Sequence, residues 1–213
     1  MDIKICGLTE REAIAAAVRH GVSHLGFIFY PPSPRAITPE TAAEITAGIS
    51  EDVKIVAVLV DPSDENISRV ITHLSPHILQ LHGSETPERV VDIKNKFNTR
   101  IMKAIKVSNA EDIQFSKEYD KAVDLVLFDA LPPSNNIDAL PGGNGIPFNW
   151  TLLNSTIHAT PWFLSGGINI SNVKEAVRIT GAKAIDISSG VEDKPGSKSV
   201  KKIVKLMEIM KGL

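Results

Sequence analysis

The feature that most constrains the fold is a regular alternation of short apolar runs with segments of helical composition. Such pairs recur at intervals of roughly 20 to 30 residues through the whole chain of 213 residues. We expect eight strands, at residues 2–6, 24–30, 53–60, 78–82, 100–105, 124–129, 162–166 and 184–187. We expect helices at residues 10–20, from Pro39, from Ser63, and at 87–97, 109–118, 149–157, 171–180 and 198–211.

Strands that alternate with helices on this scale pair in parallel, and eight such units close into a (β/α)8 TIM barrel with its site on the loops that follow the strands. We therefore predict an α/β fold in which residues 1–213 form a single barrel domain. The alternative is an open doubly wound sheet. That fold normally carries a Gly-x-Gly-x-x-Gly turn after its first strand, whereas this chain reads Cys6-Gly7-Leu8-Thr9 there, so the barrel is favoured.

Composition excludes several classes of partner. The formal net charge of −2 supplies no basic field for nucleic acid, and no apolar run approaches the ~20 residues that cross a bilayer. The basic amphipathic segment 201–207 suggests a membrane surface, but a barrel helix with a solvated face explains it better. A single cysteine and the absence of signal-peptide features favour the reducing cytoplasm. We expect a small-molecule substrate, and the sequence leaves monomer and homodimer open.

Polar residues interrupt strands that should be apolar in a barrel. Because side chains alternate between the two faces of a strand, residues two apart share a face. Alone, each has an ordinary structural explanation, such as a small buried cysteine, a satisfied core histidine or a capping aspartate. Together they place ionisable groups near one mouth of the barrel, which predicts a site formed by Lys4 with Cys6, Gln80 with His82, Lys103, Asp129, and Asp186 with Ser188.

Glycine-containing turns follow the last two predicted strands. Residues 165–168 read Ser-Gly-Gly-Ile and residues 188–191 read Ser-Ser-Gly-Val. The loops after the seventh and eighth strands of a barrel commonly bind phosphate through free backbone N–H groups. A third glycine cluster, at 141–150, lies in a long connection that is either a lid over the substrate or a tolerated insertion.

These segments carry a resemblance to a known family. The chain resembles the phosphoribosylanthranilate isomerases of tryptophan biosynthesis, and the matching segments run in order from one end to the other. They are Lys4-Ile5-Cys6-Gly7-Leu8-Thr9, Gly26-Phe27-Ile28-Phe29-Tyr30 with Ser33-Pro34-Arg35, Gln80-Leu81-His82-Gly83, Phe128-Asp129, Gly142-Gly143-Asn144-Gly145 with Phe148 and Trp150, Leu164-Ser165-Gly166-Gly167, and Asp186-Ile187-Ser188-Ser189-Gly190-Val191-Glu192.

The resemblance implies an Amadori rearrangement of N-(5-phosphoribosyl)anthranilate, without cofactor or metal. It assigns Asp129 as the general acid and Cys6 as the general base. A cysteine base acts as its thiolate, so we expect the thiol pKa to fall from about 8.5, with Lys4 as a nearby cation that lowers it. A carboxyl acid must be protonated, which apolar surroundings or another carboxylate favour by raising its pKa.

The same resemblance assigns the substrate contacts. Arg35 would bind the anthranilate carboxylate, Asp186 would hold a hydroxyl or the anthranilate amine, and His82 would line the site without an assigned role. The phosphate would be held by Gly145, Gly166, Gly167, Ser189 and Gly190.

The chain departs from the family in the sixth loop. The family commonly reads Gly-Lys-Thr-Phe-Asp-Trp there, whereas residues 145–150 read Gly-Ile-Pro-Phe-Asn-Trp, so a positive charge and a carboxylate are missing, although Asn149 can still cap a helix. Two rival functions remain open: an aldolase that uses Lys103 as a Schiff-base amine, and a phosphosugar-binding barrel without turnover.

Overall fold

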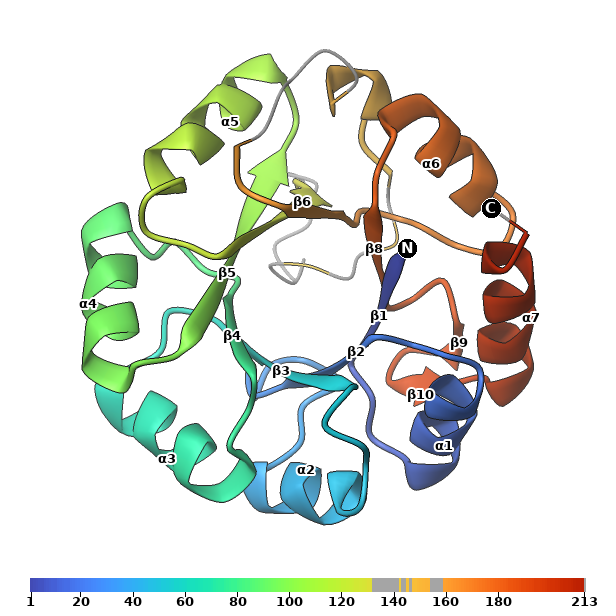
Figure 1. The fold of residues 1–213 in the computed structure, drawn as a ribbon, viewed down its shortest axis with the longest axis horizontal. Helices are drawn as coiled ribbons and strands as arrows, with labels where there is room; N and C mark the ends of the chain where they lie inside the picture. Colours follow the sequence, from blue (N-terminus) through green and yellow to red (C-terminus); the bar gives the residue numbers. More distant parts are fainter. Residues whose placement is uncertain (132–141, 143–144, 146, 154–158, 213) are drawn as a thin grey trace.

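Eight parallel strands close into a barrel in the order of the sequence (Figure 1). The computed structural model describes residues 1–131, 142, 145, 147–153 and 159–212. The predicted (β/α)8 fold is confirmed, and each predicted strand is present within a few residues of its expected bounds. The strands are β1 Asp2–Cys6, β2 His24–Ile28, β3 Lys54–Leu59, β4 Ile78–Leu81, β5 Arg100–Val107, β6 Leu125–Ala130, β7 Trp162–Leu164 and β8 Ala184–Ile187.

A ring of helices surrounds the barrel (Figure 1). Several begin at a side chain that accepts a hydrogen bond from the first helical turn, such as Ser63 from the N–H of Asn66 and Thr86 from that of Arg89. The α-helices of the described residues are α1 Arg11–Arg19, α2 Pro39–Thr46, α3 Asp64–Leu74, α4 Pro87–Phe97, α5 Ala110–Phe115, α6 Val173–Thr180 and α7 Val200–Met210, and short 3-10 helices occupy η1 Ser116–Tyr119 and η2 Trp150–Leu153.

The connection between β6 and β7 differs from the expected strand-helix pattern. Where a helix was predicted over 149–157, the described part forms only the 3-10 turn η2, which Asn149 caps by accepting hydrogen bonds from the N–H and hydroxyl of Thr151. Residues 154–158 lie outside the described residues. So do 132–141, 143–144 and 146, which hold most of the predicted lid.

Side chains that point into the barrel are apolar along most of its length. Because parallel strands alternate faces, every second residue points inward, and the others pack against the helices. Ile55, Leu79 and Ile101 belong to the larger cluster that includes buried helix residues. The inner cluster consists of Val56, Ile78, Met102, Ala104, Leu125, Leu127, Phe163 and Ala184. This packing leaves room for polar groups only at the ends of the strands.

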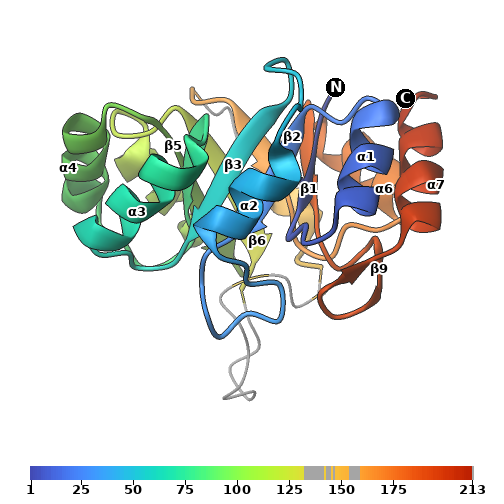
Figure 2. The same cartoon turned by 90° about the horizontal axis from the view of Figure 1, so that it is seen from below.

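A small hairpin follows β8 and was not predicted from the sequence. Strands β9 (Glu192–Lys194) and β10 (Ser197–Lys198) pair antiparallel and precede α7. The turn contains Pro195 and Gly196, and Gly196 has a φ of 85°, which favours glycine. The hairpin lies at the end of the barrel where the strands end (Figure 2).

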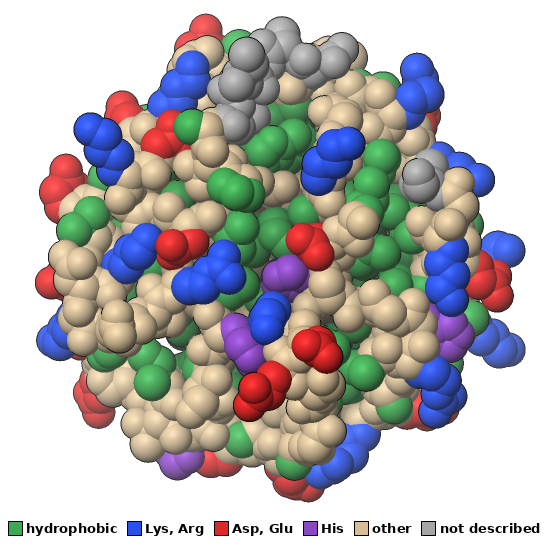
Figure 3. All heavy atoms as spheres, viewed as in Figure 1, with side chains coloured by type: hydrophobic (Ala, Val, Ile, Leu, Met, Phe, Trp, Pro, Cys, Tyr) green, Lys and Arg blue, Asp and Glu red, His purple; other side chains and the backbone are tan. Residues whose placement is uncertain are grey.

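The surface agrees with the composition. On the face seen in Figure 3, basic and acidic side chains are interspersed rather than gathered by sign. The longest helices among the described residues have 11 residues, too few to cross a bilayer, and none of them qualifies as a membrane span.

His24 supplies a test of the barrel's packing. Its ring is 8% exposed, contacts Phe163 edge to face at 5.1 Å, and burial lowers its pKa from 6.5 to about 4. Below the unfolded pKa of 6.5 the unfolded chain binds a proton that the folded chain does not, so stability falls as the pH drops from 6.5 towards 4. The loss over this window amounts to about 3 kcal/mol at most.

We predict that His24→Phe removes this part of the acid sensitivity. Urea denaturation of both proteins across the window measures it: the stability of the wild type relative to the variant should decrease on acidification. Parallel curves for the two proteins would contradict a buried neutral imidazole.

Candidate active site

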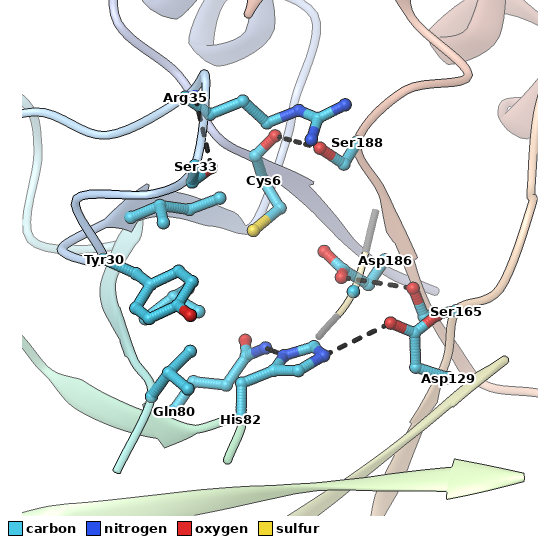
Figure 4. A pocket seen from close by; sticks show the side chains of 14 residues that line it. Cys6, Tyr30, Ser33, Arg35, Gln80, His82, Asp129, Ser165, Asp186 and Ser188 are labelled. Carbon is cyan, nitrogen blue, oxygen red and sulfur yellow. Dashed lines mark hydrogen bonds and ion pairs between the residues drawn. The ribbon is translucent and has the colours of Figure 1, made fainter. Parts of the chain in front are cut away.

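One cavity lies where the strands end, and several predicted site residues face it together (Figure 4). Its volume is about 550 Å³, including the open mouth. It brings together groups from the first four strands and from the sixth, seventh and eighth strands, or from the loops that follow them. The residues that line it are Cys6, Ile28, Tyr30, Ser33, Arg35, Val58, Val60, Gln80, His82, Asp129, Gly142, Ser165, Asp186 and Ser188.

Cys6 is the last residue of β1 and is buried beside an ion pair. Lys4, two residues earlier on the same face, is fully buried and its Nζ donates to Asp186 Oδ1 at 2.9 Å. Gly26 on β2 pairs with Cys6, and a Cβ there would lie 2.9 Å from the sulfur. The missing side chain at Gly26 therefore creates the space that the sulfur occupies.

The charges around the sulfur act in opposite directions. Burial raises the pKa of the Cys6 thiol, the Lys4 ammonium opposes this, and the Asp186 carboxylate adds to it, so the net shift is upward. Burial also disfavours the Lys4 ammonium, but Asp186 and Cys6 outweigh it and hold the pKa of Lys4 above its ordinary value. The expectation that the thiol pKa falls is therefore wrong for the unliganded protein, because desolvation exceeds the effect of one cation.

Asp129 is held at the end of β6 within a chain of polar groups. Its Oδ1 accepts the N–H of Ala130 at 2.9 Å, and its Oδ2 lies 3.3 Å from His82 Nε2. Gln80 Nε2 lies 2.8 Å from His82 Nδ1. If the amide donates, the neutral imidazole carries its hydrogen on Nε2, facing the carboxylate. Gly142 lies over this pair, and a Cβ there would be 2.8 Å from Asp129 Oδ2.

Arg35 reaches the cavity from the loop after β2. It is 4% exposed, and Glu192 of the β9–β10 hairpin accepts two hydrogen bonds from its guanidinium, at 2.8 and 2.9 Å. Its aliphatic stem packs on Gly7, where a Cβ would lie 2.6 Å from Arg35 Cδ. The cation is thus fixed in direction before any substrate arrives.

A second hollow adjoins the first and is lined by the loops after β6, β7 and β8. Gly166 and Gly167 have φ values of 79° and 68°, so the backbone turns in a way that favours glycine. Gly190 is not among its lining residues: a Cβ there would overlap the carbonyl of Ile168, so this glycine allows two loops to approach. The hollow is lined by Asp129, Ala130, Leu131, Gly145, Ser165, Gly166, Gly167, Ile168, Asp186, Ser188 and Ser189.

Lys103 does not face the cavity, and its assignment to this mouth was wrong. Met102 and Ala104 point into the barrel, so Lys103 between them points towards the helices. Its Nζ is paired with Glu85 at 3.0 Å and donates to the carbonyl of Gly83 at 2.9 Å. A Schiff-base amine for the rival aldolase reaction is therefore not present at this position in the site.

Within the described part of the chain, no group of three or more His, Cys, Asp and Glu side chains is arranged to hold a metal ion. Polar groups that line the cavity lie instead within 4 Å of an oppositely charged or titratable neighbour: Asp186 of Lys4, Asp129 of His82 and Arg35 of Glu192.

Comparison with known proteins gives a consistent result. The profile of the N-(5'-phosphoribosyl)anthranilate (PRA) isomerase family matches residues 3–209. The chain is 48% identical over 199 residues to the N-(5'-phosphoribosyl)anthranilate isomerase of Parvibaculum lavamentivorans, which covers 93% of each chain. The chain belongs to the PRA isomerase family.

Solved structures of the family have the same fold. The phosphoribosylanthranilate isomerase of Thermotoga maritima superimposes with a TM-score of 0.88 at 33% identity, covering all of both chains. A phosphoribosylanthranilate isomerase in complex with reduced 1-(o-carboxyphenylamino)-1-deoxyribulose 5-phosphate superimposes with a TM-score of 0.84 at 31% identity, again over both whole chains.

Two side chains in or beside the site, Ser165 and Lys198, were not assigned from the sequence, whereas Ser188 was predicted together with Asp186. Ser165 Oγ lies 3.4 Å from Asp186 Oδ2, and Ser188 Oγ donates to the carbonyl of Cys6 at 3.0 Å. Ser165 is inward-facing by alternation from Phe163, and Ser188 by alternation from Asp186, so the period of the strands was the available signal. Lys198 has no such signal, because a lysine before a helix looks solvated.

We predict that Gly26→Ala displaces the sulfur of Cys6. The new Cβ would lie 2.9 Å from Sγ and 3.1 Å from Lys4 Cε, and overpacking of this kind costs about 1–3 kcal/mol. Denaturation of the single variants and of the Gly26→Ala/Cys6→Ala double variant measures the coupling. Removal of the sulfur should reduce the destabilisation; an equal loss in both backgrounds would contradict the proposed clash.

We also predict opposite titration shifts from the two charges beside Cys6. Lys4→Met should raise the pKa of the thiol further, and Asp186→Asn should lower it, because one removes a cation and the other an anion. The chain has one cysteine, so thiolate absorbance against pH reports Cys6 alone. Circular dichroism checks that each variant is folded, and shifts in the same direction would contradict this electrostatic description.

Proposed function

We propose that this chain, as one catalytic domain, converts N-(5-phosphoribosyl)anthranilate to 1-(2-carboxyphenylamino)-1-deoxyribulose 5-phosphate in tryptophan biosynthesis by general acid-base catalysis. The single observation that carries the mechanism is that Cys6 and Asp129, on opposite parts of the barrel, line one cavity. Membership of the PRA isomerase family supplies the reaction, and the cavity supplies two groups able to move protons.

Asp129 is the proposed acid. In its protonated form it gives a proton to the ring oxygen of the sugar, the C1–O bond breaks, and the anthranilate nitrogen and C1 form a Schiff base. The neighbouring imidazole of His82, 3.3 Å from Oδ2, is positioned to hold the carboxylate that results. The N–H of Ala130 also donates to Asp129 Oδ1 at 2.9 Å, so the carboxylate that results keeps a backbone partner.

Cys6 is the proposed base. The Schiff base draws electrons from C2 and acidifies its hydrogen, which the thiolate removes to give an enolamine. The enolamine then takes a proton at C1 and loses its O2 proton, which yields the ketone, and proton exchange with solvent returns Cys6 to the thiolate and Asp129 to its protonated form. Because burial raises the pKa of the thiol, the ammonium of Lys4 is the group that favours the thiolate. A free thiol of this kind is compatible with the reducing cytoplasm, where we expect the enzyme to act.

The remaining groups would bind the two ends of the substrate in the two hollows. The Arg35 guanidinium suits the anthranilate carboxylate, and Asp186, beside Cys6, suits a sugar hydroxyl or the anthranilate amine. The backbone turns at Gly166, Gly167 and Ser189 suit the phosphate, which polarised N–H groups bind well. The phosphate end and the aromatic end then lie on either side of the reacting C1 and C2 atoms.

We predict that Cys6→Ala and Asp129→Asn each lower kcat by roughly 10²- to 10⁴-fold, the usual contribution of a positioned acid or base. Turnover is measured in an assay coupled to indole-glycerol-phosphate synthase. Asp52→Asn, which alters an exposed aspartate outside the cavity, serves as the matched control and should keep normal turnover. Circular dichroism confirms folding, and near-normal kcat in either cavity variant would refute its assigned role.

A further inference from the structure

The β9–β10 hairpin contacts the site through Glu192 without itself lining the cavity. Glu192 opens the hairpin and accepts from Arg35 Nε at 2.8 Å and from Nη2 at 2.9 Å. Both side chains are about 5% exposed. A carboxylate that receives two parallel N–H bonds fixes both the position and the plane of a guanidinium. The hairpin thus sets the direction of the cation that faces the cavity.

Glu192 is itself held in place. Lys198, from the second strand of the hairpin, donates to Glu192 Oε1 at 2.5 Å and to the carbonyl of Ser188 at 3.1 Å. Burial would raise the pKa of Glu192, but Arg35 and Lys198 outweigh it and hold the pKa below its ordinary value. The carboxylate therefore stays ionised beside Arg35, whereas burial lowers the pKa of Lys198.

Backbone contacts anchor the hairpin to the loop that carries Arg35. A Cβ at Gly196 would overlap the carbonyl of Pro34, the residue before Arg35, so only glycine permits this approach. The hydroxyl of Thr9 donates to the carbonyl of Gly196 at 3.3 Å. The hairpin is consequently tied to the loops after β1 and β2 as well as to β8.

We propose that Glu192, held by Lys198, is the positioning residue that orients Arg35, so that the β9–β10 hairpin determines the preference of the site for a carboxylate on the aromatic ring. This inference rests on the proposed function. Without Glu192 the guanidinium loses the two hydrogen bonds that set its plane, and a planar two-point contact with a carboxylate loses more from misorientation than a point charge does. The Arg35 cation held in this way favours an anionic ring substituent over a neutral one.

The test compares the kcat/KM values of each variant for two substrates. One is N-(5-phosphoribosyl)anthranilate, and the other is the corresponding aminoaldose made from aniline, which lacks the carboxylate. The readout is the ratio of their kcat/KM values. Glu192→Gln keeps the shape of the side chain but can accept through one oxygen only. We expect it to lower the ratio roughly tenfold or more, mainly through KM for the anthranilate substrate.

Control variants separate positioning from general damage. Asp193→Asn alters the next residue of the same hairpin, whose exposed carboxylate pairs with Lys202, and should leave the ratio unchanged. Glu192→Asp keeps the charge but is one methylene shorter, so the ratio should fall less than in Glu192→Gln. If Glu192→Gln does not fold by circular dichroism, Glu192→Asp carries the test and must still lower the ratio.

The possible outcomes are distinct. A ratio that falls in the Glu192 variants and not in Asp193→Asn supports the inference. If the Glu192 variants lose kcat/KM equally for both substrates, the ratio is unchanged. That result overturns the inference and leaves the proposed function standing. A wild-type protein that does not turn over the anthranilate substrate overturns the proposed function, and the inference with it.

Discussion

The alternation of side chains along eight closed parallel strands is the constraint on which the whole structure depends. It sends every second residue into a space that the strands themselves enclose. Below the mouth that space is filled by apolar residues such as Val56, Met102 and Phe163, which pack against one another. One step further along the strands the same rule delivers Cys6 and Asp129 to the mouth. Inward-pointing residues thus form the core in the interior of the barrel and line the cavity at its mouth.

Polar groups at this depth need partners, and the partners come from distant parts of the chain. Lys4 is fully buried and would be strongly disfavoured alone, but Asp186 on the adjacent β8 supplies a carboxylate at 2.9 Å. Arg35 and Glu192 satisfy each other in the same way. Each pair fixes the position of a side chain that lines the cavity, Asp186 in the first and Arg35 in the second, so burying the charges also orders the candidate site.

The sequence was sufficient for the eight-stranded barrel and for the groups on inward strand positions, but not for the β9–β10 hairpin or for the 3-10 turn η2 after β6. Cys6, His82, Asp129 and Asp186 follow from period two together with the position of each strand's end. Lys103 shows the limit of that approach. It was predicted to lie at the mouth because it is a charged residue in a strand, but it alternates with the inward-pointing Met102 and Ala104 and therefore faces the helices. The upward shift of the thiol pKa also escaped prediction, because the balance between burial and neighbouring charges requires coordinates.

Because β1 lies between β2 and β8, the barrel's seam joins an early part of the chain to a late one. During synthesis the thiol leaves the ribosome among the first residues, yet neither the carboxylate that pairs with Lys4 nor the one that orients Arg35 exists until β8 and its hairpin have been translated. A shortened translation product that ends before them would hold a sulfur and no assembled site. The candidate site can therefore form only after translation has passed β8 and the β9–β10 hairpin.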